Sequence, residues 1–331
     1  MPVKPKLAIY WASSCGGCEI AVVNLHERLL ELDALFDICF CPCLLDTKKH
    51  DLEAWPDRSI AITLFNGAIR TDENLEMAHL LRNKSATLIA CGACAKGGGI
   101  PALSNFHSSL RHFSSIYFCN PTIDNPGFAV PQEITTVAEG ALPLPRFHDQ
   151  VRTLADVVAV DYFIPGCPPE PDRLWEALTA LVGAEPPPPG TVLGTGATTV
   201  CEECARVKEE KRVSRFRRIT EFIPDEGACL LEQGLVCMGI ATRGGCGGLC
   251  PAANSPCIGC YGPPQGVSDQ GARMLAALGS ILDPGELRGL REEVVVARIE
   301  AAAASITDCA GSFYLFSLAE SLLKGAARRP Q

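Results

Sequence analysis

The chain has 331 residues, of which 47% are apolar and 20% are charged, so it can bury one large or two ordinary cores. Its net charge of −9 argues against a general nucleic-acid-binding protein, because phosphate binding needs a basic surface. The longest apolar stretch near the end, residues 301–323, is interrupted by Asp308, Glu320 and several serines. We therefore expect a helix docked on protein there, and no membrane span.

The chain contains eighteen cysteines. Its start, MPVKPKLAIY, has no apolar export segment, no small-residue cleavage site and no twin-arginine pair. We therefore predict a cytoplasmic protein. In a reducing compartment clustered cysteines bind metal more often than they form disulfides.

The first half of the chain alternates between short apolar runs and helical patterns. Residues 6–12 predict a strand, residues 13–18 a loop, and the apolar spacing from Ile20 to Leu32 a helix. Further strands are predicted at residues 36–44, 59–65, 87–90, 115–119 and 157–164, and helices at 73–82 and 171–182. This alternation predicts an α/β fold with a parallel sheet covered on both faces.

Cysteines follow three of these predicted strands. Cys15 and Cys18 follow the first strand, Cys94 follows the strand at 87–90, and Cys167 follows the strand at 157–164. Because functional groups gather beyond the carboxyl ends of parallel strands, we expect these thiols to meet at one edge of the sheet.

Four consecutive prolines at residues 186–189, followed by Gly190, interrupt the pattern and predict a stiff connector. We therefore divide the chain into domains 1–185 and 186–331. Residues 201–264 are rich in glycine and proline and lack clear periodicity, so metal bonds must supply much of their folding energy. Helices are predicted after them, at 271–281, 286–304 and 312–327.

The first candidate ligand set comprises Cys15, Cys18, Cys94 and Cys167. Two cysteines separated by two residues can turn toward one iron–sulfur cluster, and glycines let the backbone curl around the sulfurs. By itself, the Cys15–Cys18 pair would equally fit a thioredoxin-type redox site or half of a zinc site. The added weight comes from Cys94, just before three glycines, and from Cys167 in a Gly-Cys-Pro-Pro sequence.

Eight further cysteines fall within about sixty residues and form two more sets. The second set comprises Cys201, Cys204, Cys229 and Cys237, and the third set comprises Cys246, Cys250, Cys257 and Cys260. Cys250 precedes a proline, as in ferredoxin-type runs. Zinc is the alternative, since all-cysteine zinc sites use similar short spacings, although their ligands usually lie on two paired hairpins.

Six cysteines stand outside the three sets, and their roles are open: Cys39, Cys41, Cys43, Cys91, Cys119 and Cys309. We expect each to pack in a core as a small apolar side chain. Cys39, Cys41 and Cys43 alternate along a predicted strand and would share one face.

A basic stretch lies between Cys204 and Cys229. It contains seven basic residues: Arg206, Lys208, Lys211, Arg212, Arg215, Arg217 and Arg218. A solvated helix face is one explanation. The alternative is functional, because such charge could steer an acidic electron carrier or offset the negative charge of an all-thiolate cluster.

These motifs resemble those of the small subunits of nickel–iron hydrogenases, over nearly four-fifths of the chain. Cys15-Gly16-Gly17-Cys18-Glu19, Gly92-Ala93-Cys94-Ala95 and Gly166-Cys167-Pro168-Pro169 resemble the motifs that hold the family's proximal cluster. Cys257-Ile258-Gly259-Cys260 resembles its medial-cluster region. The chain looks most like the cytoplasmic, methyl-viologen-reducing type that works with heterodisulfide reductase, and the resemblance implies a flavodoxin-like first domain and a ferredoxin-like second domain.

Two departures from the periplasmic members favour three 4Fe-4S clusters. Those members carry a histidine where this chain has Cys201, and their medial cluster usually has three cysteines, whereas Cys250 offers a fourth. The related subunit of respiratory complex I fits poorly, because it has adjacent cysteines in place of Cys15 and Cys18 and lacks the eight downstream cysteines.

The resemblance implies an electron-transfer subunit with no complete active site of its own, since nickel belongs to a large-subunit partner. Electrons from hydrogen would enter at the first set, pass the third and leave from the second, toward an acceptor such as heterodisulfide reductase with a small iron–sulfur adaptor. Two alternatives remain. One is a small subunit linked to deazaflavin, nicotinamide or ferredoxin, and the other is a zinc-stabilised scaffold without a redox role.

Overall fold

The computed structural model describes residues 4–283, 285 and 289–324, which form two compact units. The first unit contains the described residues up to Leu193 together with those from Leu318 onward, and the second is Gly194–Ser317. The chain therefore returns to its first unit after completing the second. The predicted domains 1–185 and 186–331 did not include such a return.

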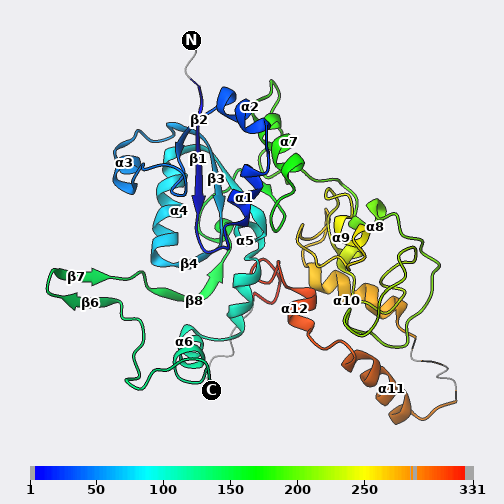
Figure 1. The fold of residues 1–331 in the computed structure, drawn as a ribbon. Helices are drawn as coiled ribbons and strands as arrows, with labels where there is room; N and C mark the ends of the chain where they lie inside the picture. Colours follow the sequence, from blue (N-terminus) through cyan, green and yellow to red (C-terminus); the bar gives the residue numbers. More distant parts are fainter. Residues whose placement is uncertain (1–3, 284, 286–288, 325–331) are drawn as a thin grey trace. The chain divides into compact units, whose positions relative to one another are not determined.

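A five-stranded parallel sheet forms the centre of the first unit (Figure 1). Its strands are β1 (Lys6–Trp11), β2 (Asp37–Phe40), β3 (Ile60–Asn66), β5 (Ser85–Cys91) and β9 (Tyr162–Ile164). They lie in the order β2-β1-β3-β5-β9, and every neighbouring pair is parallel. This is the flavodoxin-like strand order, so the predicted α/β class is confirmed.

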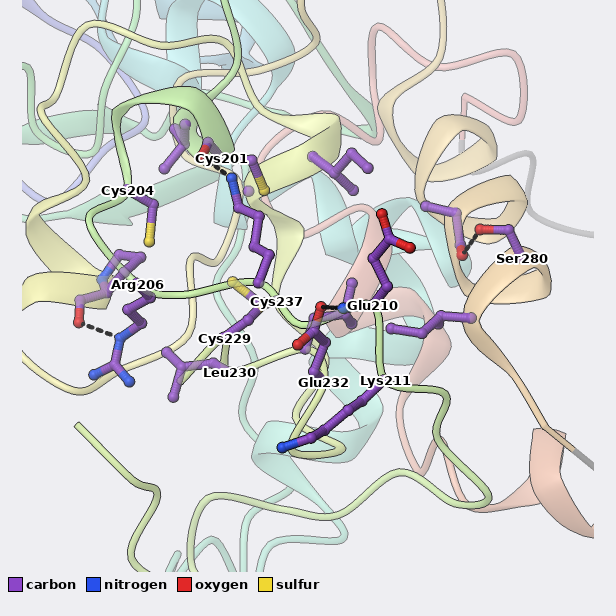
Figure 2. Close-up of a pocket in the computed structure, with 18 of the residues that line it drawn as sticks. Cys201, Cys204, Arg206, Glu210, Lys211, Cys229, Leu230, Glu232, Cys237 and Ser280 are labelled. Atoms are coloured by element: carbon purple, nitrogen blue, oxygen red, sulfur yellow. Dashed lines mark hydrogen bonds between the residues drawn. The ribbon is translucent and has the colours of Figure 1, made fainter. Parts of the chain in front are cut away.

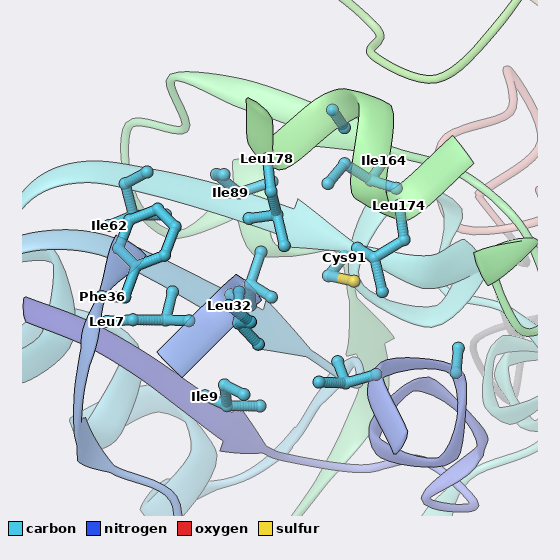
Figure 3. Close-up of a cluster of buried hydrophobic side chains, with 14 of the residues drawn as sticks. Leu7, Ile9, Leu32, Phe36, Ile62, Ile89, Cys91, Ile164, Leu174 and Leu178 are labelled. Atoms are coloured by element: carbon cyan, nitrogen blue, oxygen red, sulfur yellow. The ribbon is translucent and has the colours of Figure 1, made fainter. Parts of the chain in front are cut away.

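Helices cover both faces of this sheet. They are α1 (Gly17–Val23), α2 (Arg28–Leu35), α3 (Lys49–Ala54), α4 (Asp72–Lys84), α5 (Gly92–Gly97) and α7 (Pro171–Val182). Leu7 of β1 packs with Leu32 and Leu174 from α2 and α7 (Figure 3), whereas Ala8 packs in a second cluster with Leu81 from α4. Successive side chains of a strand point to opposite faces, so β1 contributes to both cores.

The strand predicted at residues 36–44 is shorter than expected. β2 ends at Phe40, before Pro42. Cys41 then begins a turn, in which its carbonyl accepts hydrogen bonds from the amides of Leu44 and Leu45. Cys41 is buried in the Leu7 cluster, whereas Cys39 packs against the Ala8 cluster. The prediction that these cysteines share one face is therefore wrong.

The strand predicted at residues 115–119 is also wrong, because the segment belongs to α6 (Ser109–Tyr117). Ser108 caps this helix by accepting from the amide of Arg111, and Phe113 and Tyr117 form a ring contact at i,i+4 spacing. Two antiparallel pairs were not predicted. They are β4 (Ile69–Thr71) with β8 (Phe147–Arg152), and the hairpin of β6 (Ile134–Val137) and β7 (Gly140–Pro143).

The second unit is irregular, as predicted for residues 201–264. Its helical elements are α8 (Val200–Glu203), η3 (Met238–Ala241), α9 (Leu249–Ala252), α10 (Gln270–Ile281), α11 (Glu292–Ala304) and α12 (Cys309–Phe313). α10 confirms the helix at 271–281, and α11 confirms most of 286–304, of which 286–288 lie outside the described residues. The helix predicted at 312–327 is wrong in its described part, since α12 ends at Phe313, and residues 325–327 lie outside that part.

No helix among the described residues is both long enough and apolar enough to cross a membrane.

The returning segment is fixed to the first unit next to α5. The amide of Ala319 donates to the carbonyl of Gly97 at 3.2 Å, and Lys96 Nζ lies 2.9 Å from Glu320 Oε2. The side chains of Lys96 and Glu320 are only 12% and 22% exposed. This ion pair therefore lies largely out of water, close in sequence to Cys94.

Replacing Lys96 with methionine is expected to lower the free energy of unfolding by about 2 kcal/mol, because it leaves the Glu320 carboxylate buried without its partner. The matched control is Lys4→Met, whose partner Asp33 is 78% exposed and whose loss should cost roughly 0–1 kcal/mol. Urea unfolding of both variants measures the difference. Equal effects would contradict the assigned role of the buried pair.

Candidate metal centres

The first cysteine set lies beyond the carboxyl ends of three strands of the sheet. Cys15 and Cys18 follow β1, Cys94 lies in α5 directly after β5, and Cys167 follows β9. Because β1, β5 and β9 are parallel, their carboxyl ends share one edge of the sheet. The structure thus brings together residues some 150 positions apart, as the order of predicted strands indicated.

The raised pKa values of Cys94 and Cys167 show that the thiols of this set lie near one another. Burial, followed by the nearby thiols of Cys167, Cys18 and Cys15, raises the pKa of Cys94 to about 12. Burial and the thiols of Cys15 and Cys18 raise the pKa of Cys167 to about 11. The sulfurs are therefore close enough for the charge of one to oppose ionisation of the next, and a bound cationic centre would relieve that opposition.

Glycines surround these sulfurs. A Cβ on Gly99 would come within 2.5 Å of Cys94 Sγ, and one on Gly92 would overlap Cys18 Sγ. A Cβ on Gly17 would lie 3.4 Å from Cys15 Sγ. Gly92 and Gly99 also have φ values of +82° and +56°, which glycine adopts without strain. The backbone thus approaches the sulfurs closely, as a cluster-binding loop requires.

Cys91 is a fifth thiol at this edge that the spacing did not indicate. A hydrogen bond with Cys91 is the largest cause of the raised pKa of Cys18, and Cys18 Sγ lies 3.9 Å from the Cys91 carbonyl oxygen. Cys91 ends β5 and is 2% exposed, so it also packs in the core as expected. Its position next to Cys18 depends on the pairing of β5, which cysteine spacing does not reveal.

The second set lines a cavity of about 610 Å³ in the second unit (Figure 2). Burial and the thiols of Cys237, Cys229 and Cys204 raise the pKa of Cys201 to about 12, while Lys208 opposes that rise. A Cβ on Gly239 would lie 3.0 Å from Cys201 Sγ and 3.8 Å from Cys237 Sγ. All four thiols of this set therefore face a common space.

The third set forms two pairs. Burial and the thiol of Cys246 raise the pKa of Cys250. Burial, then the thiols of Cys237 and Cys260, raise the pKa of Cys257. The Cys257 amide also donates to Cys237 Sγ at 3.3 Å, so the second and third sets are in direct contact.

Helix α10 supports this third set. Gln270 Nε2 donates to the carbonyl of Gly259 at 3.0 Å and to Thr242 Oγ1 at 3.2 Å. Gln270 is 2% exposed and Thr242 is fully buried. A hydrogen bond with Thr242 lowers the pKa of the Cys257 thiol, although burial raises it by more. The loop bearing Cys257 and Cys260 is therefore held by buried amide and hydroxyl groups.

Within residues 4–283, 285 and 289–324, no three histidine, cysteine, aspartate or glutamate side chains are arranged to bind a single metal ion. The donors grouped here are thiols alone, and thiolates are the ligands of both iron–sulfur clusters and all-cysteine zinc sites.

Of the six remaining cysteines, Cys41 and Cys91 are buried, as core packing predicts. Cys39 is half-buried, and its Sγ donates to the carbonyl of Leu7 at 3.4 Å. The core-packing expectation is wrong for three exposed thiols: Cys43, Cys119 and Cys309.

The basic stretch does not form the helix face that was one of its two explanations. Between α8 and η3 the described chain consists of turns, bends and isolated bridges. Lys208 Nζ donates to the carbonyl of Cys201. Arg206 is buried, at 9% exposure, and lines the cavity of the second set. The helix prediction was wrong because it rested on seven basic residues alone. Only a regular spacing of apolar residues could have distinguished a helix from a loop.

Comparisons with known proteins identify the family of this chain. The family described as NADH ubiquinone oxidoreductase, 20 Kd subunit, matches residues 15–181. Over 283 residues the chain is 41% identical to the iron-sulfur subunit of the F420-non-reducing hydrogenase of Archaeoglobus profundus, covering 84% of this chain and 88% of that relative. It is 32% identical to a subunit of the F420-non-reducing hydrogenase of Methanothermobacter marburgensis, covering 98% and 97% of the two chains.

Among solved structures, a chain of the [NiFeSe]-hydrogenase of Dm. baculatum superposes with a TM-score of 0.50 at 20% identity. The match covers 80% of this chain and 96% of that chain, and it supports the fold. The extent and identity of the sequence matches establish the relationship. This chain belongs to the family of nickel–iron hydrogenase small subunits that includes these subunits of the F420-non-reducing hydrogenases.

Proposed function

We propose that the chain is the electron-transfer subunit of a nickel–iron hydrogenase and holds three 4Fe-4S clusters. The first would be bound by Cys15, Cys18, Cys94 and Cys167, the second by Cys201, Cys204, Cys229 and Cys237, and the third by Cys246, Cys250, Cys257 and Cys260. The observation that carries the proposal is geometric: the four thiols of the first set follow three parallel strands to one edge of the sheet, where Gly92 and Gly99 bring the backbone close to two of the sulfurs. When bound, such clusters take up and release single electrons.

The residues of this chain would bind, shield and tune these clusters. Cys94 and Cys201 are half-buried, so the surrounding chain would limit the access of water to two of the proposed ligand sulfurs. The amide of Cys257 donates to Cys237 Sγ, and hydrogen bonds to ligand sulfurs tune the reduction potential of a cluster. The contact between Cys237 and Cys257 supports direct electron transfer between the second and third clusters.

Family membership implies a nickel–iron large subunit as partner, since hydrogen activation belongs to that subunit. The acceptor proposed for the electrons is a heterodisulfide reductase complex with a small iron–sulfur adaptor, and the acceptors of the alternatives are deazaflavin, nicotinamide and ferredoxin. The names of the F420-non-reducing relatives disfavour the deazaflavin F420. Hydrogen-dependent reduction assays with each acceptor discriminate among the rest. The cytoplasmic location stays a prediction.

Metal and sulfide analysis of the anaerobically purified complex tests the proposal. We expect about twelve irons and twelve acid-labile sulfides in this subunit, four of each for every cluster. Zinc without sulfide would instead support the scaffold alternative. A colourless chain without iron, after anaerobic handling, would refute the proposed function.

A further inference from the structure

Arg206 is a buried cation that joins three separate segments of the second unit. Its Nη1 donates to the carbonyls of Asp225 and Ala228 at 2.7 and 2.9 Å. Its Nε donates to the carbonyl of Pro251 at 2.9 Å, and its Nη2 to Asn254 Oδ1 at 2.6 Å. A single guanidinium thus binds two later segments of the chain, with all three of its nitrogens engaged.

Two of these acceptors, and Arg206 itself, lie close in sequence to a ligand of one of the proposed clusters. Arg206 itself is two residues after Cys204, and Ala228 directly precedes Cys229, so both belong to the second set. Pro251 directly follows Cys250 of the third set. The guanidinium therefore fixes the backbone beside cysteines of two different sets.

The acceptors of Arg206 are three backbone carbonyls and one side-chain amide, which carry no formal charge. Burying a cation costs free energy, and nearby anions offset that cost. The Asp225 carboxylate supplies part of this offset, since Arg206 is among the groups that hold its pKa below the usual value, after hydrogen bonds from Gly227 and Ala228. Arg206 lines the same cavity as the four thiols of the second set (Figure 2). An anionic all-thiolate cluster in this cavity would offset the buried charge.

Glu203 makes the complementary contact on the other side of Cys204. Its Oε1 accepts from the amide of Gly245 at 2.6 Å, and its Oε2 accepts from the amide of Gly247 at 2.9 Å. These two glycines flank Cys246, the first cysteine of the third set. The carboxylate thus fixes the chain on both sides of Cys246.

Together, Glu203 and Arg206 hold both ends of the segment 245–254 that bears Cys246 and Cys250. We propose that they are positioning residues that couple assembly of the second and third clusters, so that neither set binds its iron fully without the other. This inference rests on the proposed function. It adds that the two sites form one cooperative unit, whereas the first set assembles separately in the other unit.

The experiment compares Arg206→Lys and Glu203→Gln in the intact complex, by iron and sulfide content and by EPR spectra during redox titration. Lysine keeps the charge but has one nitrogen in place of three, so it cannot reach all four acceptors. The glutamine amide keeps one oxygen acceptor in place of two. The matched controls are the exposed Arg218→Lys and Glu226→Gln from the same region.

We expect Arg206→Lys to lose up to about two-thirds of the iron, with the EPR signals of the second and third clusters falling together and that of the first unchanged. Glu203→Gln should lower both signals in the same ratio, to a smaller extent. Both controls should keep all three signals. A purely structural role would lower the melting temperature while the folded complex keeps all three EPR signals at wild-type intensity.

Loss of only one of the two signals in either variant would overturn the inference, as would full iron content with unaltered spectra. If Arg206→Lys gives no folded complex, Glu203→Gln decides, because it replaces a single oxygen by nitrogen. Wild-type complex without iron would refute the proposed function itself, whereas fully loaded variants would refute only the coupling.

Discussion

Replacing Cys94 with serine is expected to remove or convert the first cluster and to abolish hydrogen-dependent dye reduction by the complex. Cys94 is a half-buried thiol whose pKa is raised by burial and by the thiols of Cys167, Cys18 and Cys15, so its loss removes one of the four proposed ligands. The second and third sets lie in a separate compact unit, so their clusters should remain. Iron analysis should therefore show a loss of up to about four of twelve irons.

The matched control is Cys119→Ser, since Cys119 is an exposed thiol of the same unit that belongs to none of the three sets. It should keep all the iron and wild-type dye reduction. Unchanged dye reduction in Cys94→Ser would count against the assignment of the first set.

Replacing Gly92 with alanine is expected to reduce the iron content of the first cluster. Replacing Gly190, a glycine with a similar φ angle, should leave that iron content unchanged. The φ of Gly92 is +82°, and its added Cβ would overlap Cys18 Sγ. Gly190 has a similar φ of +87°, but a Cβ there meets nothing within 4 Å. Gly190→Ala thus measures the backbone cost alone, roughly 1–2 kcal/mol.

Both alanine variants should lose that backbone stability in urea unfolding of the complex. Only Gly92→Ala should also lose iron and change the EPR spectrum of the first cluster, because Cys18 must move to admit the methyl group. If the two variants retain equal iron, the close approach of Gly92 to Cys18 has no role in cluster binding.

Much of the first unit follows from local patterns in its sequence. The strands near residues 6–12, 59–65 and 87–90 and the helix at 171–182 were predicted because short apolar runs and an amphipathic repeat are properties of neighbouring residues. Parallel pairing then places Cys15, Cys94 and Cys167 at one edge without further information. For this reason the first set could be predicted across a long sequence separation.

Features that depend on side-chain contacts between distant segments could not be predicted. The approach of Cys91 to Cys18 depends on strand register, and α6 replaced a predicted strand because residues 115–119 contain apolar residues at a spacing that fits both structures. In the second unit the loops have no period, so the burial of Arg206 follows only from contacts made after folding. The short cysteine spacings led to the prediction of the second and third sets, but they did not indicate the contact between Cys237 and Cys257.

The return of the chain to its first unit has a consequence for biosynthesis. Lys96 and Glu320 are 224 residues apart in sequence, and a ribosome adds residues from the amino terminus onward. The α5 segment that bears Cys94 therefore emerges long before Ala319 and Glu320, which later pack beside it. Until translation reaches them, Lys96 and Gly97 lack these two partners, so the contacts that fix this side of α5 form late in the synthesis of the chain.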